Sequence, residues 1–125
     1  MTIDKELLFK PRLPEEDVEL PGVGTVRVRA LNRGESLKIG RSVKSEADAA
    51  RRIAQLERKI IAVGMVDPVL TEDEVARWQE ASPAGELTPV VEKIQELSGM
   101  TPGAAKEAYK AFDEDPNAEF RLPSR

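Results

Sequence analysis

The chain has 125 residues, a net charge of −4 and 34% charged side chains, which suits one domain with a modest core. Aromatic residues make up only 4% of the chain, so that core has to be aliphatic. It contains no cysteine and no histidine, which excludes the common metal sites, cysteine nucleophiles and histidine-based triads. We therefore expect no catalytic site, no metal and no cofactor, and a protein that is not an enzyme.

Charge is unevenly distributed along the sequence. Residues 38–59 carry seven Lys or Arg against three Asp or Glu, whereas residues 60–125 carry six against thirteen. Such asymmetry suits pairing between helices, or a bipolar surface that orients a protein partner. Because the chain as a whole is acidic, we expect no nucleic-acid partner.

The first 14 residues predict a flexible arm rather than a helix. Leu7, Leu8 and Phe9 form a small apolar cluster that is bounded by Pro11 and Pro14. The N-terminus lacks the basic start and apolar stretch of a secretory signal, and the longest apolar run, residues 60–66, is shorter than the about 20 residues that cross a bilayer. We expect no membrane contact and a cytoplasmic location.

Residues 17–30 predict a β-hairpin. Val18, Leu20, Val26 and Val28 alternate with polar side chains, with the period of two expected for strands that have one buried face. The sequence Pro-Gly-Val-Gly at residues 21–24 supplies the turn. Because an isolated hairpin is marginal in water, we expect it to cover a helical core; the alternative is that its free edge accepts a partner strand.

Five short helices are predicted after the hairpin, over residues 33–42, 46–63, 72–81, 88–98 and 102–113. Asn32 with Glu35, and Thr71 with Glu74, have the spacing of capping boxes at the first and third of these helices. Ser45 is predicted to cap the second helix. Thr88 and Thr101 are each followed by proline, the pattern of an N-cap and first helical position.

The second helix is the one on which the core is expected to be built. Ile53, Leu56, Ile60 and Val63 follow a four-three spacing and form a narrow apolar seam. An ordinary core helix explains this seam; a dimerising coiled coil is the alternative. Trp78 on the third helix is interpreted as a core or half-buried anchor, with a binding hot spot as the alternative.

These elements predict an α+β fold that is mainly α, with an N-terminal β-hairpin packed on a bundle of four to five short helices. We expect a single globular domain over residues 15–113 and a flexible acidic tail over residues 114–125. Asp113, Asp115 and Asn117 have the one-three-five spacing of a calcium loop, but Ala118 stands where glycine is needed, so no calcium site is expected.

Two segments of the chain, in the order in which they occur, carry a resemblance to a known protein family. They are Val-Glu-Leu-Pro-Gly-Val-Gly-Thr-Val-Arg-Val-Arg-Ala-Leu at residues 18–31, with Glu35 opening a helix, and Ala-Val-Gly-Met-Val-Asp-Pro-Val-Leu-Thr at residues 62–71, leading into the helix that bears Trp78. This order resembles the tail assembly chaperones of long-tailed (siphovirus-type) bacteriophages. The resemblance covers residues 17–97 and depends on strand, turn and cap patterns.

The resemblance implies a protein that binds the tape-measure protein during tail assembly, with tail-tube subunits as a further partner, and that is not retained in the virion. It also implies the cytoplasm of a bacterial host, self-association, and a longer form made by programmed ribosomal frameshifting. A tape-measure protein is long, helical and apolar, so its partner needs an apolar seam. The candidate partner-binding residues are Ile53, Leu56, Ile60 and Val63 in the seam, together with Tyr109 and Phe112.

Two other functional classes remain as alternatives to the chaperone. One is a structural minor tail or connector protein of a virion, which would be found in purified particles. The other is a small winged DNA-binding regulator, which predicts binding that weakens steeply with salt.

Overall fold

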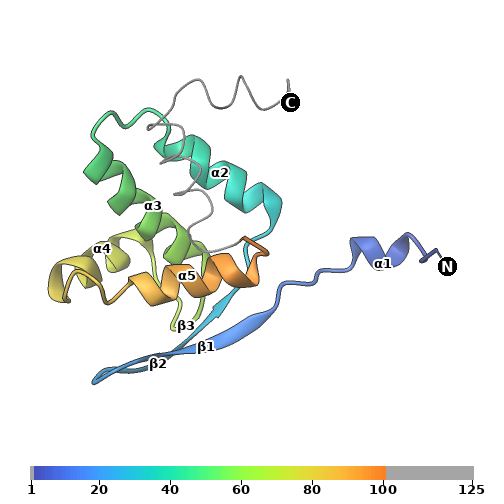
Figure 1. Ribbon diagram of the computed structural model, residues 1–125, viewed down its shortest axis with the longest axis horizontal. Coiled ribbons are helices and arrows are strands. Elements are labelled where there is room, and N and C mark those ends of the chain that lie inside the picture. The colour runs from blue at the N-terminus through green and yellow to red at the C-terminus, as the bar shows by residue number, and fades with distance from the viewer. Residues whose placement is uncertain (1, 101–125) are drawn as a thin grey trace, which may run out of the picture.

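A computed structural model describes residues 2–100 of the chain. The predicted α+β, mainly α fold is confirmed: a three-stranded antiparallel sheet is combined, within the described residues, with five helices (Figure 1). In chain order the elements are α1 (Glu6–Phe9), β1 (Glu15–Leu20), β2 (Gly24–Arg29), α2 (Arg33–Val43), α3 (Ala49–Gly64), β3 (Met65–Asp67), α4 (Glu72–Ala81) and α5 (Thr88–Leu97). None of the described helices is long and apolar enough to cross a membrane.

Strands β1 and β2 form the predicted hairpin, with Val18 opposite Val26. Val18, Leu20 and Val28 are buried while most of the intervening polar side chains are exposed, so the period-two pattern gives the right inward face. At the turn, the Val23 amide donates to the Leu20 carbonyl oxygen at 2.9 Å, and Gly22 has a φ of +79°, a conformation that glycine adopts without a steric penalty.

The third strand was not predicted. β3 pairs antiparallel with β2, with Met65 opposite Val28 and Asp67 opposite Arg27, and the register is irregular between Arg27 and Val28. The sheet order is therefore β1-β2-β3. Three residues are too few for a strand period to show in the sequence, so β3 has no local signal.

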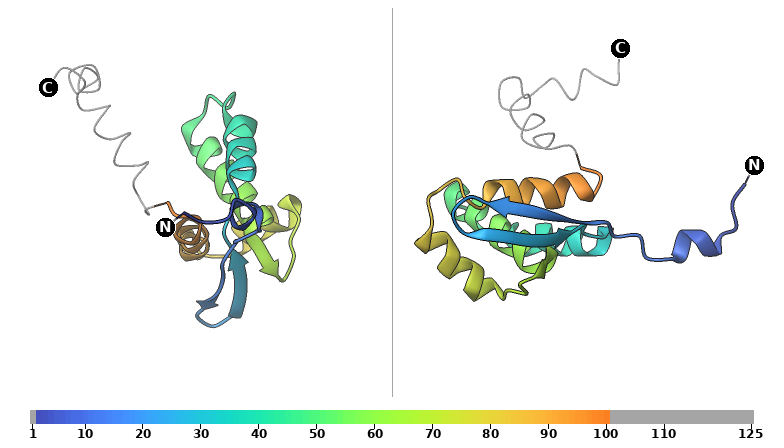
Figure 2. Two further views of the ribbon diagram at one scale, coloured as in Figure 1. Left: turned by 90° about the vertical axis from the view of Figure 1, so that its right-hand side faces the viewer. Right: turned by 90° about the horizontal axis from the view of Figure 1, so that it is seen from below.

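Helix α3 lies at the centre of the helical layer, where it packs against α2, α4 and α5. Helix α5 also packs against β1 and β2, so the hairpin covers the helices as expected (Figure 2). The shared core is aliphatic apart from one methionine. Its buried members are Val18, Leu20, Val28, Leu31, Ile39, Ile60, Ile61, Met65, Val75, Leu87, Val90 and Ile94.

Capping side chains fix the starts of α2 and α4 as predicted. The Asn32 and Thr71 side chains accept from the amides of Glu35 and Glu74, and those glutamates accept from the cap amides in return. The predicted cap of α3 is wrong. Asp48, and not Ser45, accepts from the Arg51 amide at 3.1 Å, so α3 begins at Ala49.

The start of α5 also differs from the prediction. Thr88 is the first helical residue, Leu87 occupies the N-cap position, and no side chain caps this end. Leu87 is 2% exposed. Its packing into the core therefore positions this end of the helix, and no capping hydroxyl is needed. The helix predicted over residues 102–113 lies outside the described residues.

The first 14 residues include a helical turn that the sequence did not predict. α1 spans four residues, none of them buried, and it projects away from the body of the fold (Figure 1). The base of this arm is held to the hairpin by the Ala30 amide, which donates to the Pro14 carbonyl oxygen at 2.9 Å. The arm therefore leaves the fold next to the start of α2.

Candidate functional site

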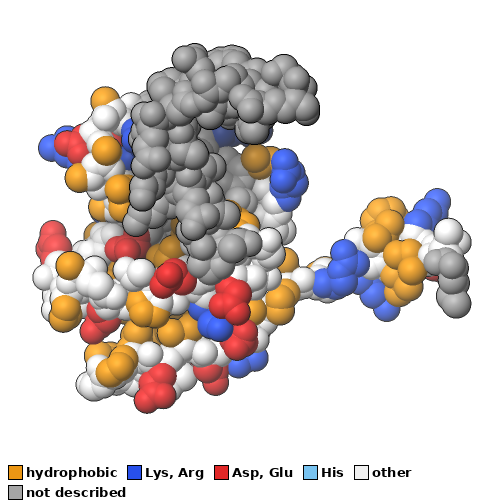
Figure 3. Space-filling model, in the orientation of Figure 1, with side chains coloured by type: hydrophobic (Ala, Val, Ile, Leu, Met, Phe, Trp, Pro, Cys, Tyr) orange, Lys and Arg blue, Asp and Glu red, His pale blue; other side chains and the backbone are white. Residues whose placement is uncertain are grey.

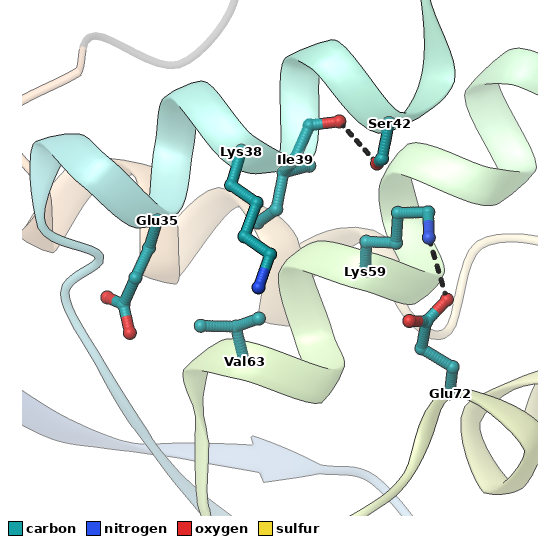
Figure 4. Close-up of a pocket in the computed structure, with 7 residues that line it drawn as sticks. All are labelled: Glu35, Lys38, Ile39, Ser42, Lys59, Val63 and Glu72. Atoms are coloured by element: carbon teal, nitrogen blue, oxygen red, sulfur yellow. Dashed lines mark hydrogen bonds and ion pairs between the residues drawn. The ribbon is translucent and has the colours of Figure 1, made fainter.

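A groove of about 280 Å³ lies between α2, α3 and the start of α4 (Figure 4). Ile39 from α2 and Val63 from α3 give it an apolar floor. Polar and charged side chains from all three helices surround this floor. The complete lining, called the α2–α3 groove below, is Glu35, Lys38, Ile39, Ser42, Lys59, Val63 and Glu72.

Glu35 at one end of the groove is held by Arg29 from β2. The Arg29 Nη1 and Nη2 atoms donate to the two carboxylate oxygens of Glu35 at 2.9 and 2.8 Å. This hydrogen-bonded pair holds the pKa of Glu35 below its usual value and raises the pKa of Arg29. The same carboxylate accepts from the Asn32 amide at 3.0 Å, so it serves the helix cap and the ion pair together.

The two lysines of the groove differ in their partners. Lys59 Nζ lies 3.0 Å from a carboxylate oxygen of Glu72, which ties α3 to the start of α4. Lys38 extends from α2 toward Val63 (Figure 4) and forms no ion pair with any residue that the structure describes. The groove therefore places an uncompensated positive charge beside its apolar floor.

The positive charge continues over the rest of α2 and α3. Lys38, Arg41, Lys44, Arg51, Arg52 and Arg58 have no ion-pair partner in the described part of the chain. The three acidic residues of the same stretch accept hydrogen bonds from uncharged groups: Asp48 caps α3, Glu46 accepts from Gln55 at 3.3 Å, and Glu57 accepts from Gln79 at 3.0 Å. Their carboxylates keep their charge, so residues 38–59, with seven cationic and three acidic side chains, carry a net charge of +4.

The predicted seam on α3 is exposed to very different extents along its length. Ile53 is 67% exposed, Leu56 and Val63 are half-buried against the core, and Ile60 is a core residue at 9% exposed. The core ends before the first turns of α3, which leaves Ile53 in solvent although it has the same spacing as the others. Of the four, only Val63 lines the groove. The other two candidates, Tyr109 and Phe112, lie outside the described residues.

The N-terminal arm carries a second group of exposed apolar side chains. Ile3, Leu7, Leu8 and Phe9 are between 47% and 69% exposed. In the space-filling view these hydrophobic side chains and neighbouring Lys and Arg side chains gather on the projecting segment (Figure 3). The apolar cluster that the sequence indicated is therefore available for contact.

Trp78 is a half-buried anchor, one of the two interpretations considered for it. Its ring packs against the core and its Nε1 donates to a carboxylate oxygen of Glu86 at 2.7 Å. This bond links α4 to the loop before α5, so the indole helps to position both helices.

Sequence reasoning did not find the groove, although it placed Lys38 and Lys59 in a basic block. The lining residues of α2 recur at positions 35, 38, 39 and 42, which is the spacing of one helical face. That spacing was visible in the sequence, but which face of α3 it meets depends on tertiary packing. An apolar floor beside a free ammonium group is able to bind an apolar side chain and a carboxylate together.

No group of three or more His, Cys, Asp or Glu side chains in residues 2–100 is arranged to hold a metal ion. Comparisons with protein-family models, with curated proteins and with solved structures found no match to this chain.

Proposed function

We propose that this chain is a tail assembly chaperone of a long-tailed bacteriophage. It acts without catalysis, in the cytoplasm of the host, by binding the tape-measure protein during tail assembly, with tail-tube subunits as a further partner. The resemblance of residues 17–97 to this class motivates the proposal. The order of hairpin, α2 with its capping box, α3, and α4 with Trp78 is consistent with it.

The observation that carries the proposal is the apolar-floored groove, which is lined partly by the positively charged stretch 38–59. A chaperone for a long helical protein needs an apolar surface that a helix can cover, and it has to stay soluble when that surface is empty. The floor formed by Ile39 and Val63 is small and is surrounded by charged side chains, which meets both requirements. Exposed Ile53 adds a second apolar contact on α3.

Co-expression tests the proposal. The chain is produced together with the long helical protein encoded beside it, and the soluble fraction is separated by size exclusion. We expect the helical protein to be insoluble alone and to co-elute with this chain. If it stays insoluble in the presence of the chain, the chaperone proposal fails.

A structural minor tail or connector protein is the second candidate. The observation that favours it is the projecting arm, because exposed Leu7, Leu8 and Phe9 are suited to a permanent contact with a neighbouring subunit. Mass spectrometry of purified virions separates the two candidates. A chaperone is absent from the particles, whereas a structural component is present in them.

A further inference from the structure

We propose that the α2–α3 groove binds one helix of a partner protein, and that this helix carries an apolar stripe flanked by Asp or Glu side chains. The inference rests on the proposed function only in taking the partner to be a helical protein. It adds the place of binding and the chemistry of the bound helix.

The shape of the groove fits a helix. α2 and α3 are consecutive helices joined by the short segment 44–48, and they pack side by side. A third helix packs into the groove between two such helices with its own ridge of side chains. Ile39 and Val63 lie at the floor where that ridge would rest. Because Val63 is only half-buried, a bound apolar side chain would remove further apolar surface from water.

Two lysines and two glutamates line the groove, and Lys38 is the one of these four without an ion pair among the described residues, which favours an acidic helix. Lys38 on the α2 wall has no ion-pair partner among residues 2–100. On α3, Arg52 and Lys59 lie at helical spacing from Val63 and so share its face. A carboxylate on the bound helix forms with Lys38 an ion pair that no residue from 2 to 100 supplies.

A nucleic acid fits the same groove less well. Glu35 and Glu72 line it, and a phosphate backbone with its continuous negative charge would have to pass both carboxylates. A helix is able to place an acidic residue opposite Lys38 and an apolar one opposite Val63. It then brings no negative charge close to the two glutamates of the groove. The apolar floor also makes no favourable contact with a charged phosphate, which favours a protein partner over DNA or RNA.

Two designed peptides test the inference with the full chain. Both are alanine-based and roughly 20 residues long, so that each is helical alone, and both carry leucines on one face. One has Glu and the other has Lys beside the leucines. We expect fluorescence anisotropy to show binding of the Glu peptide, weaker binding as salt rises from about 0.05 to about 0.3 M, and no binding of the Lys peptide.

Substitutions then locate the site. Lys38→Glu is expected to weaken binding of the Glu peptide by about fivefold or more, because it replaces an attraction with a repulsion. Arg77→Glu is the matched control, since Arg77 is exposed on α4, lies outside the groove and gives the same change in net charge. It should leave the affinity within about twofold. Val63→Ala should weaken binding without changing its salt dependence, because it removes apolar contact only.

Three results would overturn the inference: failure of the Glu peptide to bind, equal binding of the two peptides, or equal affinity in Lys38→Glu and Arg77→Glu. Displacement of the Glu peptide by a mixed-sequence DNA duplex would replace the protein partner with a nucleic acid. The proposed function is judged separately by co-elution of the tape-measure protein. Co-elution that Lys38→Glu leaves unchanged keeps the function and rejects the groove, whereas peptide binding without co-elution keeps the groove and rejects the function.

Discussion

Gly64 at the end of α3 lies directly against the side chain of Ile94 on α5. A Cβ atom on Gly64 would lie 2.7 Å from Cδ1 of Ile94 and 3.1 Å from its Cγ1 and Cγ2. Ile94 is completely buried, and Gly64 is buried at the last position of α3. The glycine has no positive φ, so its role is to let the two helices approach and not to relieve backbone strain.

Gly64→Ala should therefore destabilise the protein. Alanine gains up to about 1 kcal/mol in helix propensity, but the overlap with Ile94 costs about 1 to 3 kcal/mol in a packed core. We expect a net loss of about 1 kcal/mol in the free energy of unfolding, measured by urea denaturation. Gly40→Ala on α2 is the control, because a Cβ there meets no atom within 4 Å, and it should stabilise. Equal effects of the two substitutions would contradict this account.

The Arg29–Glu35 pair predicts a pH-dependent contribution to stability. Because the pKa of Glu35 is lowered in the folded state from a reference of 4.5, its contribution is complete above about pH 4.5 and is lost as the pH falls through the folded value. Glu35→Gln keeps a capping side chain but loses the charge. It should cost about 1 kcal/mol at pH 7 and less at a pH well below 4.5, as measured by urea denaturation at each pH.

Glu80→Gln provides the matched control for that measurement. Glu80 is exposed on α4, and its side chain has no hydrogen bond or ion pair with the described residues. Its substitution should change stability little at either pH. A Glu35→Gln effect that stays constant with pH would show that the pair contributes no net electrostatic stabilisation.

Thr71 and Thr88 look alike in the sequence but have different roles. Thr71 caps α4 and accepts from the Glu74 amide at 3.2 Å, whereas Thr88 lies inside the first turn of α5 and caps nothing. Thr71→Ala should lower the free energy of unfolding by about 1 kcal/mol, and Thr88→Ala should change it by less than about half of that. Thermal denaturation followed by circular dichroism measures both, and the reverse order would refute the assignment of the caps.

The bond between Trp78 and Glu86 gives a fourth prediction. Trp78→Phe keeps most of the apolar packing but loses the 2.7 Å hydrogen bond, which should cost about 1 kcal/mol. Glu86→Gln keeps an acceptor and should cost less. Because Trp78 is the only tryptophan, its fluorescence reports unfolding of the Glu86 variant, and circular dichroism reports both. A larger loss in Glu86→Gln than in Trp78→Phe would contradict the assignment of this loss to the hydrogen bond.

Local signals made the starts of α2 and α4 and the hairpin predictable. The capping boxes at Asn32 and Thr71 act within four residues, and the alternation of Val18, Leu20 and Val28 follows from the strand itself. The cap of α3 was harder to predict, because Ser45 and Asp48 are both good capping residues three positions apart. Only the structure shows that Asp48 makes the bond.

Long-range packing determines the features that local sequence patterns did not predict. β3 is a strand because Met65 and Asp67 pair with β2, far away in the chain. Ile53 and Ile60 share one periodicity, but the core extends only to Ile60, so one is exposed and the other is buried. The α2–α3 groove forms where one face of α2 packs beside one face of α3. The residue pattern on either helix alone does not specify which two faces pack together.

The most direct test of the proposed function is site-specific photo-crosslinking in cells that are producing the phage. A benzoylphenylalanine in place of Ser42, an exposed residue that lines the groove, leaves Lys38 unchanged, and mass spectrometry identifies what it captures. We predict a crosslink to the tape-measure protein in the cell lysate and no copy of this chain in purified virions. A chain that crosslinks to no helical tail protein, or that is present in the virion, would contradict the assignment as a tail assembly chaperone.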